Sequence, residues 1–234
     1  MNCIILAAGR NTRLDNGIPK SLLSVQGETL MERHLRLFSK IGVKRFCVVT
    51  GYRNEMLEDF FSTRKDQFNV ELVHNPKFDL ANGISLHCAA EWAEQLPEEN
   101  FFFTMADHFF TEDFLSDAMQ AKQTLDILTL VVDRPSKLNA HIDLEDVTKV
   151  KVSENKIKEI GKHLTDYDVY DTGLFLANKS MFGYLKECID NGGDSISNMV
   201  QALASADKAD VYEVSGHFWN DVDTPSDLDT TRGR

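Results

Sequence analysis

The sequence predicts an α/β protein with a Rossmann-like, three-layer α/β/α architecture around a mixed central sheet. Through residues 1–75, apolar runs that suit buried strands alternate with amphipathic runs, in the order strand, loop, helix, strand, helix, strand. This rhythm is typical of a parallel sheet with right-handed crossovers. Farther along, an alternating segment over 147–160, broken by the turn pair Glu154-Asn155, predicts a small β-hairpin inserted beside the sheet.

Composition limits the kinds of partner that this chain can bind. Its 234 residues suit one domain, 1–234, with a substantial core. A formal net charge of −12 argues against a nucleic-acid or anionic-membrane surface. The apolar runs are too short to span a bilayer, and the N-terminal run lacks the basic start of a signal peptide. Four cysteines without zinc spacing predict reduced thiols. Together these features indicate a cytoplasmic protein with a small-molecule ligand.

The first strand, residues 2–8, leads into a loop that suits a polyphosphate. The strand ends in small residues, and the loop contains two arginines before it closes at Pro19-Lys20. Small residues let backbone N–H groups approach phosphates closely, while Arg13 offers a planar fork and Lys20 a compact charge. The spacing matches neither a P-loop nor G-x-G-x-x-G. The alternative is a hydrophobic edge strand followed by a solvated basic loop.

The remaining elements follow from the spacing of apolar residues. Helices are expected where these residues recur every three or four positions, and strands where short apolar runs end in turn residues. The expected helices are 30–38, stopped by Gly42, and 54–61, begun by Asn54 as N-cap, then 85–92, 181–189 and 195–203. The expected strands are 45–50, 70–74, 101–105, 126–132, 168–176 and 209–214.

Asp107 follows a very apolar strand that contains three consecutive phenylalanines. A carboxylate at the carboxyl end of a central strand is well placed to hold Mg²⁺. Asp107 could instead cap the helix that starts near Thr111. His108 is expected to be a neighbour rather than a ligand, because imidazole is a poor partner for Mg²⁺.

A second pair of carboxylates lies near the C-terminus, in the stretch Asp221-Val222-Asp223-Thr224-Pro225. Residues two apart in an extended segment point the same way, and Thr-Pro suits the start of a helix. With Asp107, either aspartate could complete an oxygen-rich Mg²⁺ site. The sequence leaves both open, and we favour Asp223.

These motifs together resemble those of the nucleotidyltransferases with the MobA-like fold. The first loop is similar to the signature L-A-A-G-x-G-[ST]-R-L…P-K, with Asn11 in place of the second glycine, and the C-terminal stretch is similar to D-[VI]-D-T-P-x-D-L. Asparagine tolerates positive φ better than other non-glycine residues, so the loop can still form. The later motifs Thr-Met-Ala-Asp-His, Ile-Gly-Lys-His-Leu and Trp-Asn-Asp-Val-Asp-Thr look like those of inositol-1-phosphate and phosphonate cytidylyltransferases.

The resemblance implies an Mg²⁺-dependent reaction of CTP with a small phosphorylated or phosphonate acceptor, inositol-1-phosphate first. It implies that Arg13 and Lys20 are catalytic and that Asp107 with Asp223 or Asp221 holds the metal. The implied nucleotide-binding residues are Leu6, Ala7, Ala8, Gly9, Arg10, Asn11, Thr12, Asn82, Gly83, Ser85 and Ala106. The implied acceptor-binding residues are Asp133, Arg134, Lys149, Asp171, Thr172 and Gly173. In this division, 1–125 mainly binds nucleotide and 126–234 mainly binds acceptor.

Each of these assignments has an alternative. The segment Asn82-Gly83-Ile84-Ser85 suits a plain turn and N-cap as well as a nucleotide contact. Charges on the hairpin can be an ordinary solvated face. The acceptor could be 2-aminoethylphosphonate or phosphocholine, the reaction could be sugar-1-phosphate uridylyl or guanylyl transfer, or the chain could be a non-catalytic nucleotide sensor. A homodimer is also left open.

Overall fold

The structure is a computed structural model, and it describes residues 1–10, 13–14, 17–64, 66–123 and 126–234. Within these ranges the longer strands are β1 Asn2–Ala7, β4 Arg45–Thr50, β5 Val70–His74, β6 Asn100–Met105, β8 Leu128–Asp133, β9 Lys149–Ser153, β10 Lys156–Gly161, β11 Val169–Asn178 and β12 Ala209–Val214. The short strands are β2 Ser24–Val25, β3 Glu28–Thr29, β7 His108–Phe110 and β13 Trp219–Asp221. The α-helices are α1 Leu30–Lys40, α2 Asn54–Ser62, α3 Asn82–Cys88, α4 Ala90–Glu94, α5 Glu112–Ala118, α6 Met181–Asp190, α7 Ile196–Ser205 and α8 Pro225–Arg232, with 3-10 turns at Lys20–Leu22 and Met119–Gln123.

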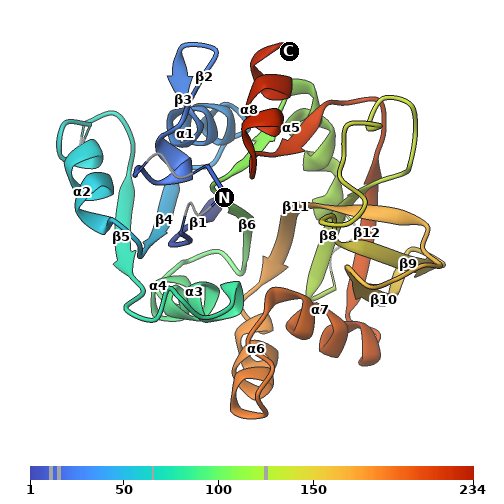
Figure 1. The fold of residues 1–234 in the computed structure, drawn as a ribbon. Helices are drawn as coiled ribbons and strands as arrows, with labels where there is room; N and C mark the ends of the chain where they lie inside the picture. The colour runs from blue at the N-terminus through green and yellow to red at the C-terminus, as the bar shows by residue number, and fades with distance from the viewer. Residues whose placement is uncertain (11–12, 15–16, 65, 124–125) are drawn as a thin grey trace.

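The longer strands form one mixed sheet in the order β5-β4-β1-β6-β11-β8-β12-β10-β9 (Figure 1). The pairs among β5, β4, β1 and β6 are parallel, as is β12 with β8, whereas β11 runs antiparallel to both β6 and β8. The predicted mixed α/β sheet is therefore confirmed. No helix in the described ranges combines the length and apolar character needed to cross a membrane.

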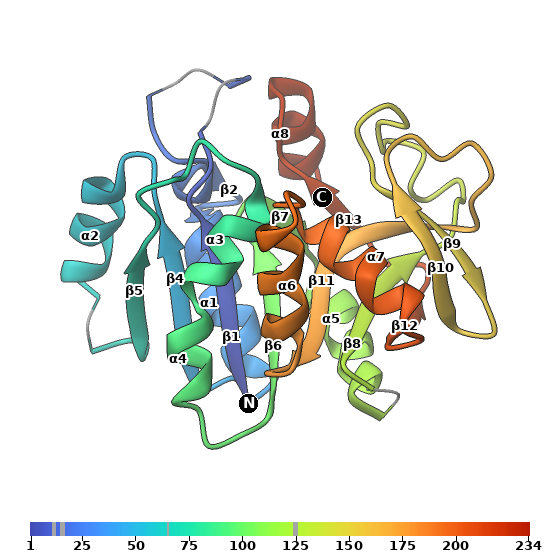
Figure 2. The same ribbon diagram turned by 90° about the horizontal axis from the view of Figure 1, so that it is seen from below.

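Helices cover both faces of the sheet, as Figure 2 shows. Along β1, Ile4 and Leu6 pack into the core cluster beneath α3, α4, α6 and α7, whereas Cys3 and Ile5 pack into the cluster beneath α1, α2 and α5. All six residues of β1 are buried, as expected for a strand covered on both sides. The three-layer arrangement follows from this alternation along the central strands.

Most predicted elements are confirmed, several to the residue. The predicted strands 45–50, 70–74 and 209–214 have the same ends as β4, β5 and β12. The hairpin turns at Glu154 and Asn155, whose φ values of 54° and 60° are those of a tight hairpin turn. The predicted strand 168–176 is β11, and the predicted helices 181–189 and 195–203 are α6 and α7 to within two residues at each end.

Two local predictions were wrong. The helix expected over 85–92 is divided into α3 and α4, and α3 begins earlier, at Asn82. The N-cap of α2 is Arg53, in the left-handed region, while Asn54 donates to Glu58 one turn later at 2.8 Å. Sequence patterns locate helices better than they locate helix ends.

The strand β11 contains a bulge between Asp171 and Leu174, where its register against β8 shifts. Gly173 in this bulge has φ of +75°, and a Cβ there would lie 2.2 Å from Nε2 of His108. The glycine expected to allow close approach therefore accommodates the ring of His108.

Replacing this glycine should destabilise the fold more than replacing another left-handed glycine. We expect Gly173→Ala to lower the free energy of unfolding by roughly 2–4 kcal/mol, because a left-handed Cβ and overpacking against His108 both oppose it. Gly42→Ala is the matched control: its φ is +92° but nothing lies within 4 Å of the added Cβ, so about 1–2 kcal/mol is expected. Urea unfolding with an unchanged m-value measures both. Equal losses would contradict the steric argument.

Candidate active site

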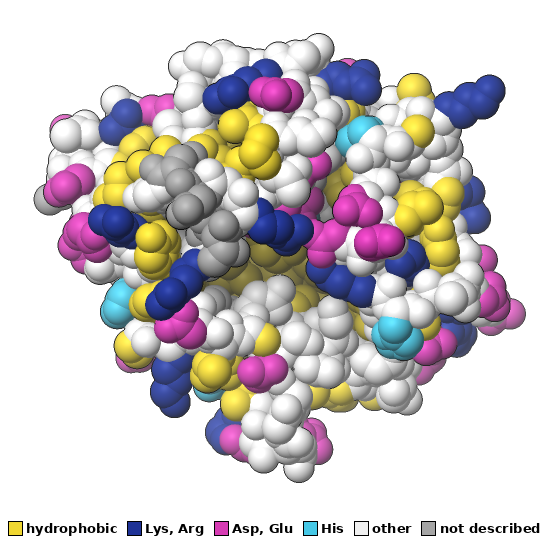
Figure 3. Space-filling view, viewed as in Figure 1, with side chains coloured by type: hydrophobic (Ala, Val, Ile, Leu, Met, Phe, Trp, Pro, Cys, Tyr) yellow, Lys and Arg dark blue, Asp and Glu magenta, His cyan; other side chains and the backbone are white. Residues whose placement is uncertain are grey.

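The antiparallel pair β7–β13 brings two distant segments together at the carboxyl end of β6. In this pair Asp221 lies opposite His108, which follows Asp107 directly. A cavity of about 460 Å³ opens there, and Figure 3 shows the hollow, with basic and acidic side chains meeting at its rim. Its lining from the first half of the chain is Arg13, Asn82, Met105, Asp107 and His108. Its lining from the second half is His141, Ile142, Asp143, Asp146, Val147, Thr148, Lys162, Asp171, Gly173, Trp219, Asn220, Asp221, Asp223, Thr224, Ser226 and Asp227.

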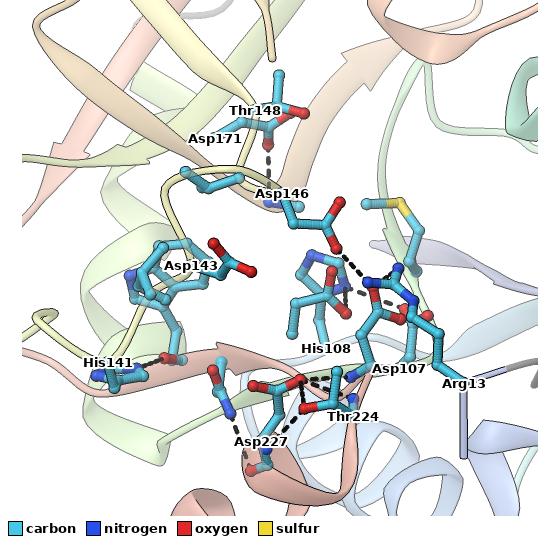
Figure 4. A pocket seen from close by; sticks show the side chains of 18 of the residues that line it. Arg13, Asp107, His108, His141, Asp143, Asp146, Thr148, Asp171, Thr224 and Asp227 are labelled. Atoms are coloured by element: carbon cyan, nitrogen blue, oxygen red, sulfur yellow. Dashed lines mark hydrogen bonds and ion pairs between the residues drawn. The ribbon is translucent and has the colours of Figure 1, made fainter.

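Arg13 lines this cavity, Lys20 lies beside it, and both pair with its carboxylates. Arg13 lies 2.6 Å from Oδ2 of Asp146 and also pairs with Asp223 (Figure 4). Lys20 lies 3.0 Å from Oδ2 of Asp107 and also pairs with Asp223. Both predicted cations and two of the three predicted metal carboxylates are thus part of one network.

The charges of this network shift one another's pKa values. Burial alone would raise the pKa of Asp107, but Lys20 and His108 outweigh it and hold that pKa well below its usual range. Burial alone would lower the pKa of His108, yet the carboxylates of Asp221 and Asp107 raise it to about 9. At neutral pH the centre of the site therefore contains an ionised carboxylate beside an imidazolium.

Asp221 contains an unsatisfied oxygen that suits a divalent metal ion. Its Oδ1 is buried without a hydrogen-bond partner in the described part of the chain, although 42% of the side chain as a whole is exposed. Burial raises the pKa of Asp221 to about 6. Ligand atoms of Asp107, His108 and Asp221 lie within 4.8 Å of one another. A buried acceptor beside a second carboxylate is the donor set that Mg²⁺ prefers.

This geometry favours Asp221 over Asp223, against our expectation from sequence. The side chain of Asp223 is 11% exposed, and its two oxygens pair with Arg13 and Lys20. The two aspartates do line the same cavity, as their spacing predicts. Sequence could not separate them, because the partners of Asp223 are about 200 residues away in the chain.

The start of the first loop forms a second, smaller cavity of about 50 Å³. Among the predicted nucleotide contacts, its lining includes Leu6, Ala7, Gly9, Arg10 and Ala106, together with Lys20. Ala8 is buried beside it, and its carbonyl accepts a hydrogen bond from the backbone N–H of Tyr52. The predicted contacts Asn11 and Thr12 lie outside the described residues.

Asn82 is the only residue of the predicted 82–85 contact segment that lines either of these two cavities, and its Oδ1 accepts from the N–H of Ile196 at 2.9 Å. The hydroxyl of Ser85 is buried and accepts from Asn75 at 2.9 Å. Gly83 packs against the carbonyl oxygen of Asp194, which would lie 2.4 Å from an added Cβ. The structure therefore gives Gly83 a packing role and Ser85 a buried hydrogen bond, and neither is the N-cap that the alternative expected, because the N-cap of α3 is Ala81.

Of the predicted acceptor residues, some line the cavity and others have structural contacts elsewhere. Asp171 and Gly173 line the cavity, and Oδ1 of Asp171 accepts the N–H of Gly173 at 2.8 Å. Burial raises the pKa of Asp171 to about 6. Thr172 points into the sheet, where it is fully buried and donates to the carbonyl of Val131 at 2.7 Å.

The other three predicted acceptor residues do not line either cavity. Lys149 is buried and donates to the carbonyl of Lys162 at 2.8 Å. Arg134 forks onto Glu213 of β12 at 3.0 and 2.8 Å, on an exposed surface. Asp133 is buried beneath the cavity wall. Strand alternation predicts which residues share a face, but not which face meets the cavity.

Four charged residues of the cavity were missed by sequence reasoning, namely Asp143, Asp146, Lys162 and Asp227. Lys162 pairs with Asp146, and Asp143 lies in the same loop, 134–148. Lys162 follows a glycine in the motif Ile-Gly-Lys-His-Leu, which could have identified it. Asp143 and Asp146 belong to an acidic run just before the hairpin, and no periodic pattern places that loop over the site.

Comparisons with known proteins agree with the fold. Curated relatives named bifunctional IPC transferase and DIPP synthase are 34% identical over 98% of this chain in Thermococcus kodakarensis and 33% identical over 98% of it in Aquifex aeolicus. The chain spans about half the length of these relatives, 49% and 50%. A solved structure described as the inositol-1-phosphate CTP transferase from T. maritima is 28% identical, with a TM-score of 0.82 over 97% of this chain and 90% of that one. Residues 3–208 match one family profile, and the chain therefore belongs to the MobA-like NTP transferase domain family.

Proposed function

We propose that this chain is an Mg²⁺-dependent cytidylyltransferase that joins CTP to a small phosphorylated alcohol, with inositol-1-phosphate as the first candidate. The observation that carries the proposal is that Arg13 and Lys20 both pair with Asp223 at the cavity, while Lys20 also pairs with Asp107. The similar solved structure of an inositol-1-phosphate CTP transferase suggests the nucleotide and the acceptor. The division of labour between 1–125 and 126–234 belongs to the same proposal, since the cavity has lining residues from both parts.

The proposed reaction is an in-line displacement at phosphorus. An oxygen of the acceptor phosphate attacks the α-phosphorus of CTP, and the bond from that phosphorus to the β-phosphate oxygen breaks as pyrophosphate leaves. No general base is required, because the acceptor oxygen is already ionised. Arg13 holds the triphosphate and the leaving pyrophosphate, and Lys20 neutralises charge at the α-phosphate. Lys162, released from Asp146, holds the acceptor phosphate from the opposite wall.

The carboxylates of Asp107 and Asp221 are the residues that would hold the metal ion. Bound Mg²⁺ supplies charge neutralisation to the phosphates. Asp223 is assigned a different task, which is to orient the two cations before substrate arrives. His108 and Gly173 close the floor beneath these groups, because the ring of His108 occupies the space left by the missing Cβ.

Pyrophosphate release tests the proposal directly. CTP, UTP, GTP and ATP are each combined with inositol-1-phosphate, 2-aminoethylphosphonate, phosphocholine and glucose-1-phosphate in the presence of Mg²⁺. Turnover with CTP and inositol-1-phosphate is the expected result. Turnover with UTP or GTP and the sugar phosphate would replace the cytidylyl assignment. Nucleotide binding without turnover in every combination would favour a sensor.

One observation supports 2-aminoethylphosphonate as the second candidate acceptor. Asp143 and Asp171 line the cavity and have no ion-pair partner in the described part of the chain. Two such carboxylates suit a primary ammonium group as well as the hydroxyls of a polyol. Phosphocholine is less suited, since Trp219 is the only Trp, Tyr or Phe among the described lining residues and is 2% exposed.

The ion pair between Arg13 and Asp146 should compete with nucleotide. We expect Asp146→Asn to tighten CTP binding roughly two- to fivefold, the range that an exposed ion pair of up to about 1 kcal/mol allows. Calorimetric titration of CTP without acceptor measures this effect. Asp143→Asn, which changes a neighbouring carboxylate that is not paired with Arg13, is the control and should leave the affinity unchanged. Weaker binding by Asp146→Asn would refute the competition.

A further inference from the structure

Asp133 ends β8 with a buried carboxylate that joins two segments of the cavity wall. The residue is 4% exposed, and its backbone lies between Tyr170 of β11 and Val214 of β12 in the sheet. Its Oδ2 accepts the indole N–H of Trp219 at 2.9 Å and the side-chain amide of Asn139 at 2.8 Å. A single carboxylate oxygen thus accepts two hydrogen bonds, one from the loop that contains Asn139 and one from β13.

Each donor belongs to a segment that carries charged groups of the site. Trp219 begins β13, and Asp221 ends it. Asn139 lies in the loop 134–148, which carries Asp143 and Asp146. The two segments also meet directly, because a ring nitrogen of His141 lies 3.0 Å from the carbonyl oxygen of Trp219.

Asn139 stabilises the shape of the loop as well as its attachment. Its amide also donates to the carbonyl of Arg134 at 2.9 Å, and its Oδ1 accepts the N–H of Ser136 at 2.8 Å. One side chain therefore closes the start of the loop and connects it to Asp133. The hydrogen bonds to the carboxylate are charge-assisted, and this class is roughly twice as strong as neutral bonds.

We propose that Asp133 is a positioning residue, which sets the separation between the loop 134–148 and β13 and so aligns Asp146 with Asp221. Asp133 itself does not line the cavity, so it acts on bound molecules only through Trp219 and Asn139. The kinetic part of this inference, that Asp133 supports turnover of the acceptor, rests on the proposed cytidylyl transfer. The mechanical part, that Asp133 holds the loop 134–148 and β13 in place, does not. An asparagine at 133 would keep the shape but place an NH₂ group, itself a donor, among the donors.

The mechanical part is tested on the ligand-free chain by hydrogen exchange. Asp133→Asn should raise exchange in 134–148 and 215–221 and leave β1, β4 and β5 unchanged. The matched control is Asp210→Asn, which alters another buried aspartate, 8% exposed and 2.7 Å from Lys156, on β12 and remote from the cavity. Unchanged exchange in both segments, or the same pattern in the control, would overturn the inference.

The kinetic part needs a readout that general destabilisation would not move. With CTP and the active acceptor, Asp133→Asn should lower kcat/KM for the acceptor by roughly 10–100-fold, by analogy with residues that orient metal ligands. The Kd for CTP should change by no more than the roughly two- to fivefold that loss of the Arg13–Asp146 pair allows. Trp219→Phe, which removes the indole N–H and also exchanges the buried two-ring indole for a smaller phenyl ring, should lower kcat/KM for the acceptor at least as much. The double variant should be little worse than the worse of the two single variants, because both break the same bond. Additive losses, or an equal rise in the Kd for CTP, would overturn a positioning role.

The two proposals fail in different ways. A wild-type chain without turnover refutes the cytidylyl transfer alone, and Mn²⁺ binding then replaces kinetics as the second readout. In that case Asp133→Asn should weaken Mn²⁺ binding, measured by electron paramagnetic resonance, because β13 carries Asp221. Unchanged Mn²⁺ affinity would overturn the positioning role of Asp133 irrespective of the reaction.

Discussion

Lys20→Met should reduce kcat for pyrophosphate release by roughly 10²–10³-fold, the loss found when one preorganised donor to a developing oxyanion is removed. The side chain of Lys20 is 15% exposed and its ammonium pairs with both Asp107 and Asp223, so little water is present to replace its charge. The Kd for CTP should change much less than kcat, because Arg13 still neutralises the triphosphate. Steady-state kinetics and calorimetric CTP binding together give both numbers.

Lys158→Met provides the control for this prediction. Lys158 is an exposed lysine on β10 that lines neither of the two cavities of the candidate site, so the same chemical change there should leave kcat unchanged. Thermal unfolding of both variants separates lost catalysis from lost structure. If Lys20→Met raised the Kd for CTP by the same factor as it lowered kcat/KM, with kcat unchanged, its role would be substrate binding alone.

Asp221→Asn and Asp223→Asn should have different effects although they make the same change two residues apart. Asp221→Asn should weaken Mn²⁺ or Mg²⁺ binding by at least the roughly 10–100-fold that follows replacement of residues around a metal site. The reason is the buried Oδ1 of Asp221, which accepts no hydrogen bond in the described part of the chain and lies 3.9 Å from Nδ1 of His108, near Asp107. Asp223→Asn should leave metal affinity nearly unchanged and act on Arg13 and Lys20 instead.

Metal binding by the ligand-free chain, measured with Mn²⁺ by electron paramagnetic resonance, decides between the two aspartates without turnover. The Mg²⁺ dependence of pyrophosphate release then gives the same comparison under catalysis. Each variant is the control for the other, since both remove one charge from the same cavity wall. A larger loss of metal affinity in Asp223→Asn would restore the assignment that the sequence favoured.

The fold could be predicted closely because its elements are encoded locally. The apolar run within β4, the Val and Tyr residues of β12 and the turn residues Glu154 and Asn155 specify their own structure within a few residues. Helix ends were less predictable because they depend on caps. Arg53, for example, adopts a left-handed conformation that nothing in its own side chain requires.

The site was predictable only where a motif ties chemistry to the end of a strand. Arg13, Lys20 and Asp107 satisfy that condition and converge as expected. Asp146 does not, because its contact with Arg13 joins residues 133 apart and its loop has no periodic pattern. For Lys149 the strand was predicted but the direction of the side chain was not. Its ammonium points inward to the carbonyl of Lys162.

Asp146 pairs with both Arg13 and Lys162, so before substrate binds the two cations are already neutralised by a carboxylate of the protein instead of by salt ions. An incoming triphosphate displaces carboxylates that remain attached to the protein, so few salt ions are released into solution. Binding to a bare cationic pocket weakens steeply as salt rises, because mobile ions compete for the cations. Here the group that competes with CTP for the cations is the carboxylate of Asp146, whose local concentration does not depend on the salt in solution. The affinity for CTP should therefore change little between dilute buffer and the ionic strength of a cell.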